Sequence, residues 1–235
     1  MEKRVFILAN SFKHYPMRCI AGREIIHNER GEIQWGGWIR PVSDHDEGAL
    51  GLDECRYSDG SNPKPLDIAD IPLGAPENDQ IQPENWFIRP NKRWTKTGEE
   101  NVNIAKTLAE QPNNLWLEDD QKTDRVSPKS LARMERRQSL YLIRPDSLHL
   151  QIETRTWEGR RKKRVRGNFR YKGQTYDLGV TDPLIEQKYC PNFRNIPDGV
   201  IRLKHDDKNL LCVSLAPLFQ GLHYKVIAAI LELMP

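Results

Sequence analysis

Cysteine is scarce in this chain, and long hydrophobic runs are missing. The 235 residues include only four widely separated cysteines, which are Cys19, Cys55, Cys190 and Cys212. Disulfide frameworks and structural zinc sites need more cysteines or close pairs, so we expect four reduced thiols. The longest apolar runs, such as Val226–Leu231, are much shorter than the roughly 20 residues that cross a bilayer, so we expect no membrane helix.

Signatures of common enzyme classes are missing as well. The sequence has no phosphate-binding loop, dinucleotide fingerprint, nucleophile elbow or His-Glu-x-x-His zinc motif. The apolar stretch Val5–Ala9 near the start is too short for a secretory signal, which predicts a cytoplasmic protein. We therefore expect a binding protein rather than an enzyme, with no catalytic residue, no metal and no cofactor.

Charge is unevenly distributed, although the formal net charge is only +3. Residues 1–43 carry seven basic and four acidic side chains, residues 44–120 carry seven and seventeen, and residues 121–235 carry twenty-two and twelve. Segregation of this kind does not determine a fold. It predicts that one surface attracts polyanions while another repels them.

The first 43 residues have the pattern of three strands of a curved sheet. Arg4–Ser11 is a short apolar run that ends in turn formers. Met17–His27 and Glu32–Val42 form a predicted hairpin that turns at Asn28–Gly31. Gly36 and Gly37 interrupt the second strand of the hairpin and predict a bulge or bend, which small barrels use to close.

From Ser43 to about Asp120 this pattern gives way to acidic residues, prolines and glycines. We expect a long, acidic, loop-rich insertion over about 44–120, with a short helix near Val102–Gln111. Ser127 and Pro128 then supply a cap and a first-turn proline for a short basic helix over Lys129–Arg137. The chain is predicted to be mainly β, with one or two short helices.

Strand patterns return after the basic helix. The predicted strands are Leu140–Ile143, Leu148–Trp157, Val165–Tyr171, Thr175–Val180, Leu210–Leu215 and Tyr224–Leu233. Lys172–Gly173 is a predicted tight turn. Two barrel-like units therefore follow one another, over residues 1–138 and 139–235.

Several short segments resemble those of one known family. They are Phe6–Ser11, Arg18–Gly22, Gly37–Ser43, Leu178–Pro183, Leu211–Leu215 and His223–Ile230. Together they resemble the dual OB-fold-containing family of prokaryotes, which is associated with anti-phage conflict systems. The matching segments are spread over nearly the whole chain and skip about 44–120. The resemblance implies two tandem oligonucleotide-binding (OB) barrels and a nucleic-acid-binding or sensing role, without a residue-level site. The charge distribution places the acidic insertion in the first barrel and makes the second barrel basic.

The segment 155–172 has nine basic residues and one acidic residue, Glu158. The basic residues are Arg155, Arg160, Arg161, Lys162, Lys163, Arg164, Arg166, Arg170 and Lys172. Like charges on one hairpin repel, so a polyanion would relieve the array. The aromatic residues Trp157, Phe169, Tyr171 and Tyr176 are interleaved, and a basic groove with exposed rings is how single strands are held. We predict that these cations, with Trp157 and Tyr171, bind single-stranded DNA or RNA, the alternative being a solvated charged turn.

A second candidate patch lies in the first unit. Arg18, Trp38 and Arg40 are its predicted nucleic-acid-binding residues, since strand alternation places Trp38 and Arg40 on one face. The alternative is that Trp38 packs in the core while Arg40 pairs with a nearby acid.

Other functions stay open. Asp182, Glu186 and Lys188 have the spacing of a metal-dependent nuclease site, although Asp182 before Pro183 is more simply a turn residue. A basic barrel also suits a small nucleotide, or an acidic protein partner encoded in the same operon. Asp44-His45-Asp46-Glu47 has the pattern of a solvated loop rather than a metal site. Finally, the acidic insertion would compete with nucleic acid if it covered the basic hairpin. The leading expectation is a protein that binds single-stranded or structured DNA or RNA, as an accessory or sensing component of a defence or nucleic-acid-processing system.

Overall fold

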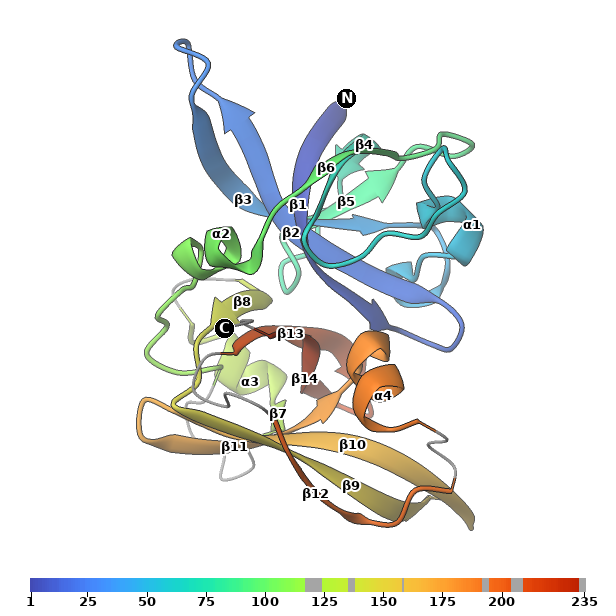
Figure 1. The fold of residues 1–235 in the computed structure, drawn as a ribbon, viewed down its shortest axis with the longest axis vertical. Helices are drawn as coiled ribbons and strands as arrows, with labels where there is room; N and C mark the ends of the chain where they lie inside the picture. The colour runs from blue at the N-terminus through green and yellow to red at the C-terminus, as the bar shows by residue number, and fades with distance from the viewer. Residues whose placement is uncertain (117–123, 135–137, 158, 192–194, 204–208, 233–235) are drawn as a thin grey trace. The chain divides into compact units, whose positions relative to one another are not determined.

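Two β-rich units make up the chain in the computed structural model, which describes residues 1–116, 124–134, 138–157, 159–191, 195–203 and 209–232 (Figure 1). The first unit contains Met1–Thr107 and Arg137–Ser139, and the second contains Leu108–Arg136 and Leu140–Pro235. Strands predominate in both units, which confirms the mainly β prediction. Across the described ranges, no helix is both long enough and apolar enough to cross a membrane.

A closed barrel of five strands forms the first unit. The strands are β1 (Glu2–Phe12), β2 (Arg18–His27), β3 (Ile33–Val42), β4 (Asp67–Pro76) and β5 (Asn85–Ile88), with β6 (Thr95–Glu99) added outside β4. They pair in the order β1-β2-β3-β5-β4, and β4 pairs back onto β1. The β3–β5 pair is parallel and the other barrel pairs are antiparallel. A five-stranded Greek-key barrel is the architecture of the OB fold, so the predicted fold class is confirmed.

Local sequence explains how this barrel turns and closes. The Asn28 side chain accepts hydrogen bonds from two backbone N–H groups of the β2–β3 turn, and Gly31 has a φ of 76°. At Gly22, strand β2 approaches β1 so closely that a Cβ would lie 2.1 Å from the Phe6 carbonyl oxygen. Glycine is therefore required where the two strands meet. The core enclosed by the strands contains Val5, Ile7, Ile20, Ile39, Leu50, Tyr57, Ile71 and Trp94.

The acidic segment after Ser43 is more ordered than its composition predicts. Instead of a loop-rich insertion, it supplies β4 and β5, two of the five barrel strands, as well as β6. Strand β4 alternates buried and half-buried residues along its first eight positions, but its aspartates and prolines hide that pattern in the sequence. The segment also contains a 3-10 turn η1 (Asp46–Gly48) and the short helices α1 (Leu52–Cys55) and α2 (Val102–Thr107). Removing it would therefore remove part of the barrel.

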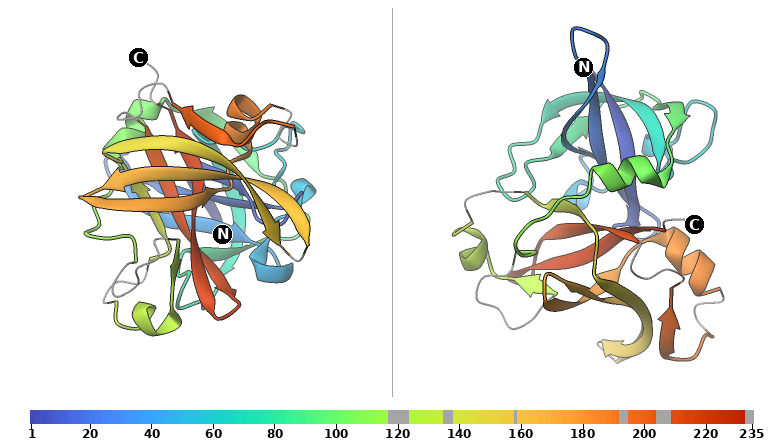
Figure 2. Two further views of the ribbon diagram at one scale, coloured as in Figure 1. Left: turned by 90° about the horizontal axis from the view of Figure 1, so that it is seen from below. Right: turned by 60° about the vertical axis from the view of Figure 1, so that its left-hand side comes forward.

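The second unit repeats the strand order of the first. Its strands are β7 (Arg125–Val126), β8 (Leu140–Ile143), β9 (Ser147–Trp157), β10 (Arg160–Tyr171), β11 (Gln174–Val180), β12 (Gly199–Arg202), β13 (Leu210–Phe219) and β14 (Leu222–Leu231). The sheet order is β12-β9-β10-β11-β14-β13-β8, with β7 on β14 and a parallel β11–β14 pair. Strands β8 and β9 are consecutive in the chain, so together they take the place of β1, with β8 beside β13 and β9 beside β10. Figure 2 (left) shows β9 and β10 crossing the β13–β14 hairpin.

Two further helices belong to the second unit. Helix α3 (Pro128–Leu131) begins at the predicted cap, where the Ser127 hydroxyl accepts the Ser130 N–H. Helix α4 (Pro183–Tyr189) lies between the third and fourth barrel strands, β11 and β13. Both helices begin with a proline, whose fixed φ suits the first helical turn.

Candidate nucleic-acid interface

The basic residues of β9 and β10 are divided between the two faces of their hairpin. The strands are antiparallel, and Lys162 lies directly opposite Arg155. Side chains alternate along a strand, and directly opposite residues share a face. One face therefore carries Arg155, Lys162, Arg164 and Arg166, while the other carries Arg161 and Lys163. The consecutive cations of the sequence are therefore divided between two opposite surfaces of the hairpin.

A groove of about 410 Å³ lies along the first of these faces. Strands β9 and β10 contribute one set of lining residues, and the β13–β14 hairpin contributes another. Its cationic lining residues are Arg125, Arg155, Lys162, Arg164, Arg166 and Lys225. In the barrel order, the β9–β10 hairpin contains the connection between the first and second strands. The β13–β14 hairpin contains the connection between the fourth and fifth strands. These are the two connections with which OB folds bind oligonucleotides.

Arg166 is the most deeply buried arginine of the groove, and the protein itself neutralises it. It is only 6% exposed, and its guanidinium lies 2.9 Å from Asp177 (Nε–Oδ1) and 3.5 Å from Asp124 (Nη2–Oδ2). Burial raises the pKa of Asp124, but the hydrogen bond from Arg125 and the charges of Arg125 and Arg166 outweigh it and hold that pKa below its usual value. Arg166 is therefore a structural cation and is not available to a phosphate.

The other groove cations of the hairpin are accessible. Lys162 and Arg164 are exposed and have no carboxylate partner among the residues that the structure describes. Arg155 pairs with Glu153 at 2.6 Å (Nε–Oε1), but its side chain is 48% exposed. Exposed pairs of this kind are weak and screened by salt, so a phosphate can compete for Arg155.

The opposite face of the hairpin is tied to the segment before β12. Asp198 accepts hydrogen bonds from the Thr154 hydroxyl and from Lys163 Nζ, at 2.7 Å and 2.9 Å. These bonds lower the pKa of Asp198 to about 2. Arg161 is exposed on this face and lies outside the groove.

The aromatic rings predicted to interleave with the cations face the core instead. Phe169, Tyr171 and Tyr176 are 2%, 4% and 1% exposed, and the Phe169 and Tyr176 rings stack with centroids 5.1 Å apart. The prediction of exposed rings is wrong for these three. Phe169 and Tyr171 alternate into the barrel along the last part of β10, and Tyr176 on β11 lies directly opposite Phe169 and shares its face. The side chains of Trp157 and Arg160 lie outside the part of the structure that is described.

Two rings that the sequence interpretation missed border the groove. Phe219 at the end of β13 is 51% exposed, and its ring centroid lies 6.2 Å from that of Tyr224 on β14. The Arg125 guanidinium carbon lies 5.4 Å from the Tyr224 ring centroid. The available sequence signal was that Phe219 directly precedes a glycine-containing pair, Gln220–Gly221. In the structure this pair forms a turn in which both residues have positive φ. A large ring beside a turn is poorly placed to enter a core.

The remaining predicted residues lie away from the groove. Arg170 is exposed on β10, and Lys172 donates from Nζ to the Gln111 carbonyl at 2.9 Å. Neither lines the groove. Both therefore add positive charge to the second barrel but lie outside the groove.

The second candidate patch is largely buried in the first unit. Trp38 and Arg40 are 7% and 2% exposed, and Arg40 donates to the Asn85 side-chain oxygen at 3.2 Å. The Arg18 guanidinium carbon lies 4.3 Å from the Phe12 ring centroid. The burial of Trp38 and Arg40 leaves little of this patch for a ligand.

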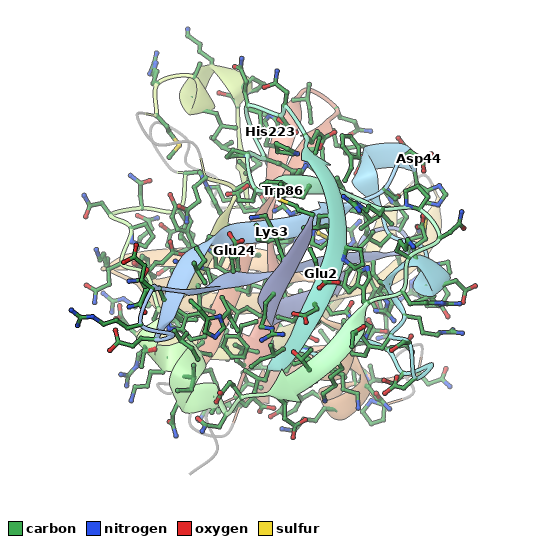
Figure 3. All side chains as sticks on the ribbon, turned by 90° about the horizontal axis from the view of Figure 1, so that it is seen from above. Glu2, Lys3, Glu24, Asp44, Trp86 and His223 are labelled. Carbon is green, nitrogen blue, oxygen red and sulfur yellow. The ribbon has the colours of Figure 1, made fainter. Side chains whose placement is uncertain are left out.

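Acidic residues of the first unit pair with its own cations. Lys3 lies between Glu24, at 2.6 Å from its Nζ, and the ring of Trp86, with the centroid 4.4 Å from Nζ (Figure 3). Arg4 pairs with Asp70 at 2.7 Å, as Lys96 does with Asp67. The carboxylates of β4 thus neutralise neighbouring strands of the same barrel.

Two of the three residues with nuclease-like spacing, Asp182 and Lys188, have structural contacts, while burial raises the pKa of Glu186. The Asp182 carboxylate is buried and accepts the backbone N–H groups of Leu184 and Ile230, each at 2.9 Å. Burial raises the pKa of Asp182 to about 6. Lys188 forms an ion pair with Glu232. Asp182 therefore joins the start of α4 to β14, with both carboxylate oxygens engaged.

Comparison with known proteins agrees with the strand order. The family model described as the dual OB-containing domain matches residues 3–230, nearly the whole chain. A search of curated protein sequences gives no match.

Proposed function

Because this chain belongs to the dual OB-containing domain family, we propose that it binds nucleic acid and that its second barrel holds a single strand of DNA or RNA. The binding surface in this proposal is the groove between the β9–β10 and β13–β14 hairpins. Lys162, Arg164 and Arg155 bind phosphates, and Phe219 stacks against a base.

The observation that carries the proposal is that exposed cations on one side of the groove face an exposed aromatic ring on the other side. Lys162 and Arg164 have no acidic partner in the described structure, while Phe219 is 51% exposed on the facing hairpin. A single strand needs both features, because its phosphates bind cations and its unpaired bases stack on rings. A duplex would offer the phosphates without the free bases.

A salt titration of binding tests the proposal. Fluorescence anisotropy with labelled single-stranded DNA and RNA gives the affinity over a range of salt concentrations. If about four groove cations bind phosphates, the logarithm of affinity falls with the logarithm of salt at a slope of about −3. Replacing both Lys162 and Arg164 with alanine reduces the magnitude of that slope by about 1.4.

The matched control is the double replacement of Arg161 and Arg170 with alanine. These two cations are also exposed on β10 and removing them changes the net charge equally, but they lie outside the groove. We expect the control variant to keep most of the parent slope. A flat salt response of the parent, or an equal loss in both variants, contradicts the groove as the binding site.

A small nucleotide is the second candidate ligand, favoured by the groove volume. About 410 Å³ falls in the range of small-molecule pockets. Thermal stabilisation by mononucleotides, without binding of longer strands, would favour this function. Binding of an acidic protein that persists in excess nucleic acid would instead favour an adaptor for a partner encoded in the same operon.

For the cellular role, we propose a cytoplasmic accessory or sensing component of a defence or nucleic-acid-processing system. The support is the family to which the chain belongs, together with a groove lined by exposed cations and an exposed ring. Loss of phage resistance on deletion of the gene, restored by the parent but not by the groove variant, tests the defence role.

A further inference from the structure

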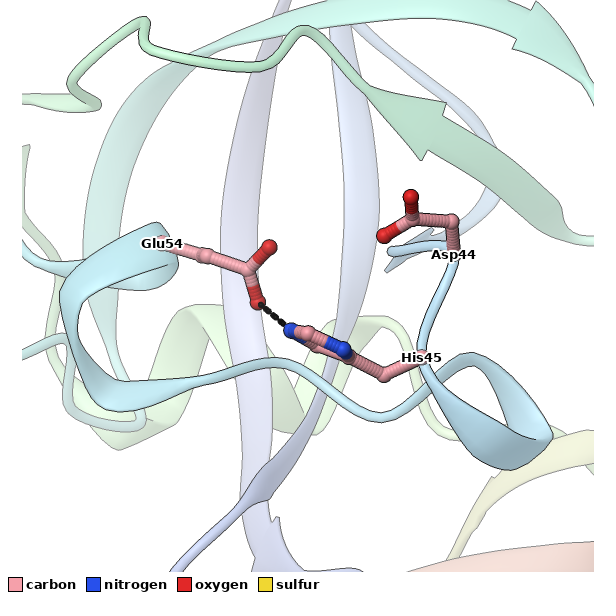
Figure 4. A group of neighbouring side chains, drawn as sticks. All are labelled: Asp44, His45 and Glu54. Carbon is pink, nitrogen blue, oxygen red and sulfur yellow. Dashed lines mark ion pairs between the residues drawn. The ribbon is translucent and has the colours of Figure 1, made fainter.

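The connection after β3 brings three potential metal ligands together (Figure 4). One ligand atom from each of Asp44, His45 and Glu54 lies within 4.8 Å of the others. Asp44 and His45 are adjacent in the sequence, whereas Glu54 comes from α1. Folding therefore adds a third donor to a stretch that has the sequence pattern of a solvated loop.

One pair of donor atoms has the separation that a shared ion requires. His45 Nε2 lies 3.3 Å from Glu54 Oε2. Zinc holds imidazole nitrogen at 2.0–2.1 Å and carboxylate oxygen at 2.0–2.2 Å, so two tetrahedral ligands of one ion lie roughly 3.4 Å apart. The Asp44 carboxylate is exposed and can approach by side-chain rotation.

The backbone that carries these donors is held in place. Ser43 accepts the His45 N–H at 3.1 Å, and the Gly51 N–H donates to Glu54 Oε2 at 2.6 Å. Between them, Ala49 and Leu50 are 1% and 0% exposed. Binding an ion would therefore order few additional groups.

A surface ion pair is the simpler account of His45 and Glu54. Asp44 and Glu54 are both anionic and repel one another, so a cation shared among the three side chains would favour their proximity. A divalent cation would attract both carboxylates and accept the imidazole nitrogen. One imidazole with two carboxylates suits zinc or manganese better than magnesium, which prefers oxygen ligands alone.

We propose that Asp44, His45 and Glu54 bind a divalent transition-metal ion of the zinc class. The site belongs to the first barrel and is independent of the proposed nucleic-acid groove. Three protein ligands leave at least one coordination position for water.

Calorimetric titration of the full-length chain with zinc chloride tests the site. We expect one zinc per chain to bind at this site, at least tenfold more weakly after Glu54→Gln or Asp44→Asn. Glutamine keeps an oxygen that can accept the Gly51 N–H, and Asp44 is exposed, so both variants are expected to fold. Circular dichroism checks this directly.

The controls are Asp53→Asn and His27→Ala, which remove an exposed acid beside Glu54 and an exposed histidine elsewhere in the first unit. Both should bind zinc as the parent does, and zinc should shift the NMR imidazole resonances of His45 but not those of His27. Unchanged affinity in the Asp44 and Glu54 variants, an equal loss in the controls, or an unmoved His45 signal overturns the proposal. Magnesium binding as tight as zinc binding overturns the assignment of the ion.

Discussion

Replacing Arg166 with methionine should destabilise the second barrel in a way that depends on pH. Methionine keeps an unbranched stem but removes the cation that lies 2.9 Å from Asp177 and 3.5 Å from Asp124. Removing one partner of a buried ion pair typically costs about 3–5 kcal/mol. Asp124 retains Arg125 at 2.8 Å, and the Asp177 side chain is 43% exposed, so neither carboxylate is left buried and unpaired. We therefore expect a loss below that range, about 2 kcal/mol at pH 7.

The pH dependence follows from the lowered pKa of Asp124. A carboxyl whose pKa is lower in the folded state stabilises the fold above its unfolded pKa of about 3.9, and that stabilisation is lost as the pH falls through the folded value. Arg166 contributes to the lowering, so its removal matters less once Asp124 is protonated. The difference between parent and variant should therefore shrink below about pH 4.

Urea denaturation followed by circular dichroism, at pH 7 and again near pH 3.5, measures this difference. Lys162→Met is the control, since Lys162 is exposed on the same face of β10 and its loss should change the free energy of unfolding by less than about 0.5 kcal/mol. A loss below about 1 kcal/mol for the Arg166 variant, or a loss that does not change with pH, refutes the reasoning.

Two further substitutions test the groove and the link between α4 and β14. Phe219→Ala should weaken single-strand binding by about 1–3 kcal/mol, or roughly 5- to 150-fold, in the anisotropy assay, whereas Leu218→Ala, which removes an exposed aliphatic side chain, should not. Equal losses would contradict base stacking. Because burial raises the pKa of Asp182 to about 6, its ionisation should lower the parent's free energy of unfolding as the pH rises from about 4 to 6. The expected fall in the parent's free energy of unfolding is at most about 3 kcal/mol, measured by urea denaturation. The Asp182→Asn variant should show no such fall. The same pH profile in parent and variant would contradict the buried, raised-pKa role of Asp182.

Features governed by neighbouring residues were predictable from the sequence. The turn at Asn28–Gly31 follows from an asparagine side chain that bonds local backbone and a glycine with positive φ. The same reasoning predicts the reversal at Lys172–Gly173, where both φ values are positive. Ser127 caps α3 as expected. In each case the determining contacts lie within a few residues.

Features that depend on distant parts of the chain were not predictable. Strand β4 contains Asp67, which is buried, accepts a hydrogen bond from Tyr57 and pairs with Lys96 on the neighbouring strand. Composition alone therefore makes β4 look like a loop. The groove likewise combines Arg125, Lys162 and Phe219 from three separate strands. Their convergence requires the barrel order, which the sequence pattern does not contain.

The chain does not complete one barrel before it begins the other. Leu108–Arg136 already belongs to the second unit, where the Tyr171 hydroxyl donates to the Pro112 carbonyl and Trp116 packs on Tyr141. The path then returns to the first unit at Ser139, which donates to Glu84, before Leu140 resumes the second. A protease cut at any one bond between Thr107 and Leu140 would thus leave at least one barrel without part of its own chain. The two barrels are therefore interleaved in the sequence, and only an uncut chain can complete both of them.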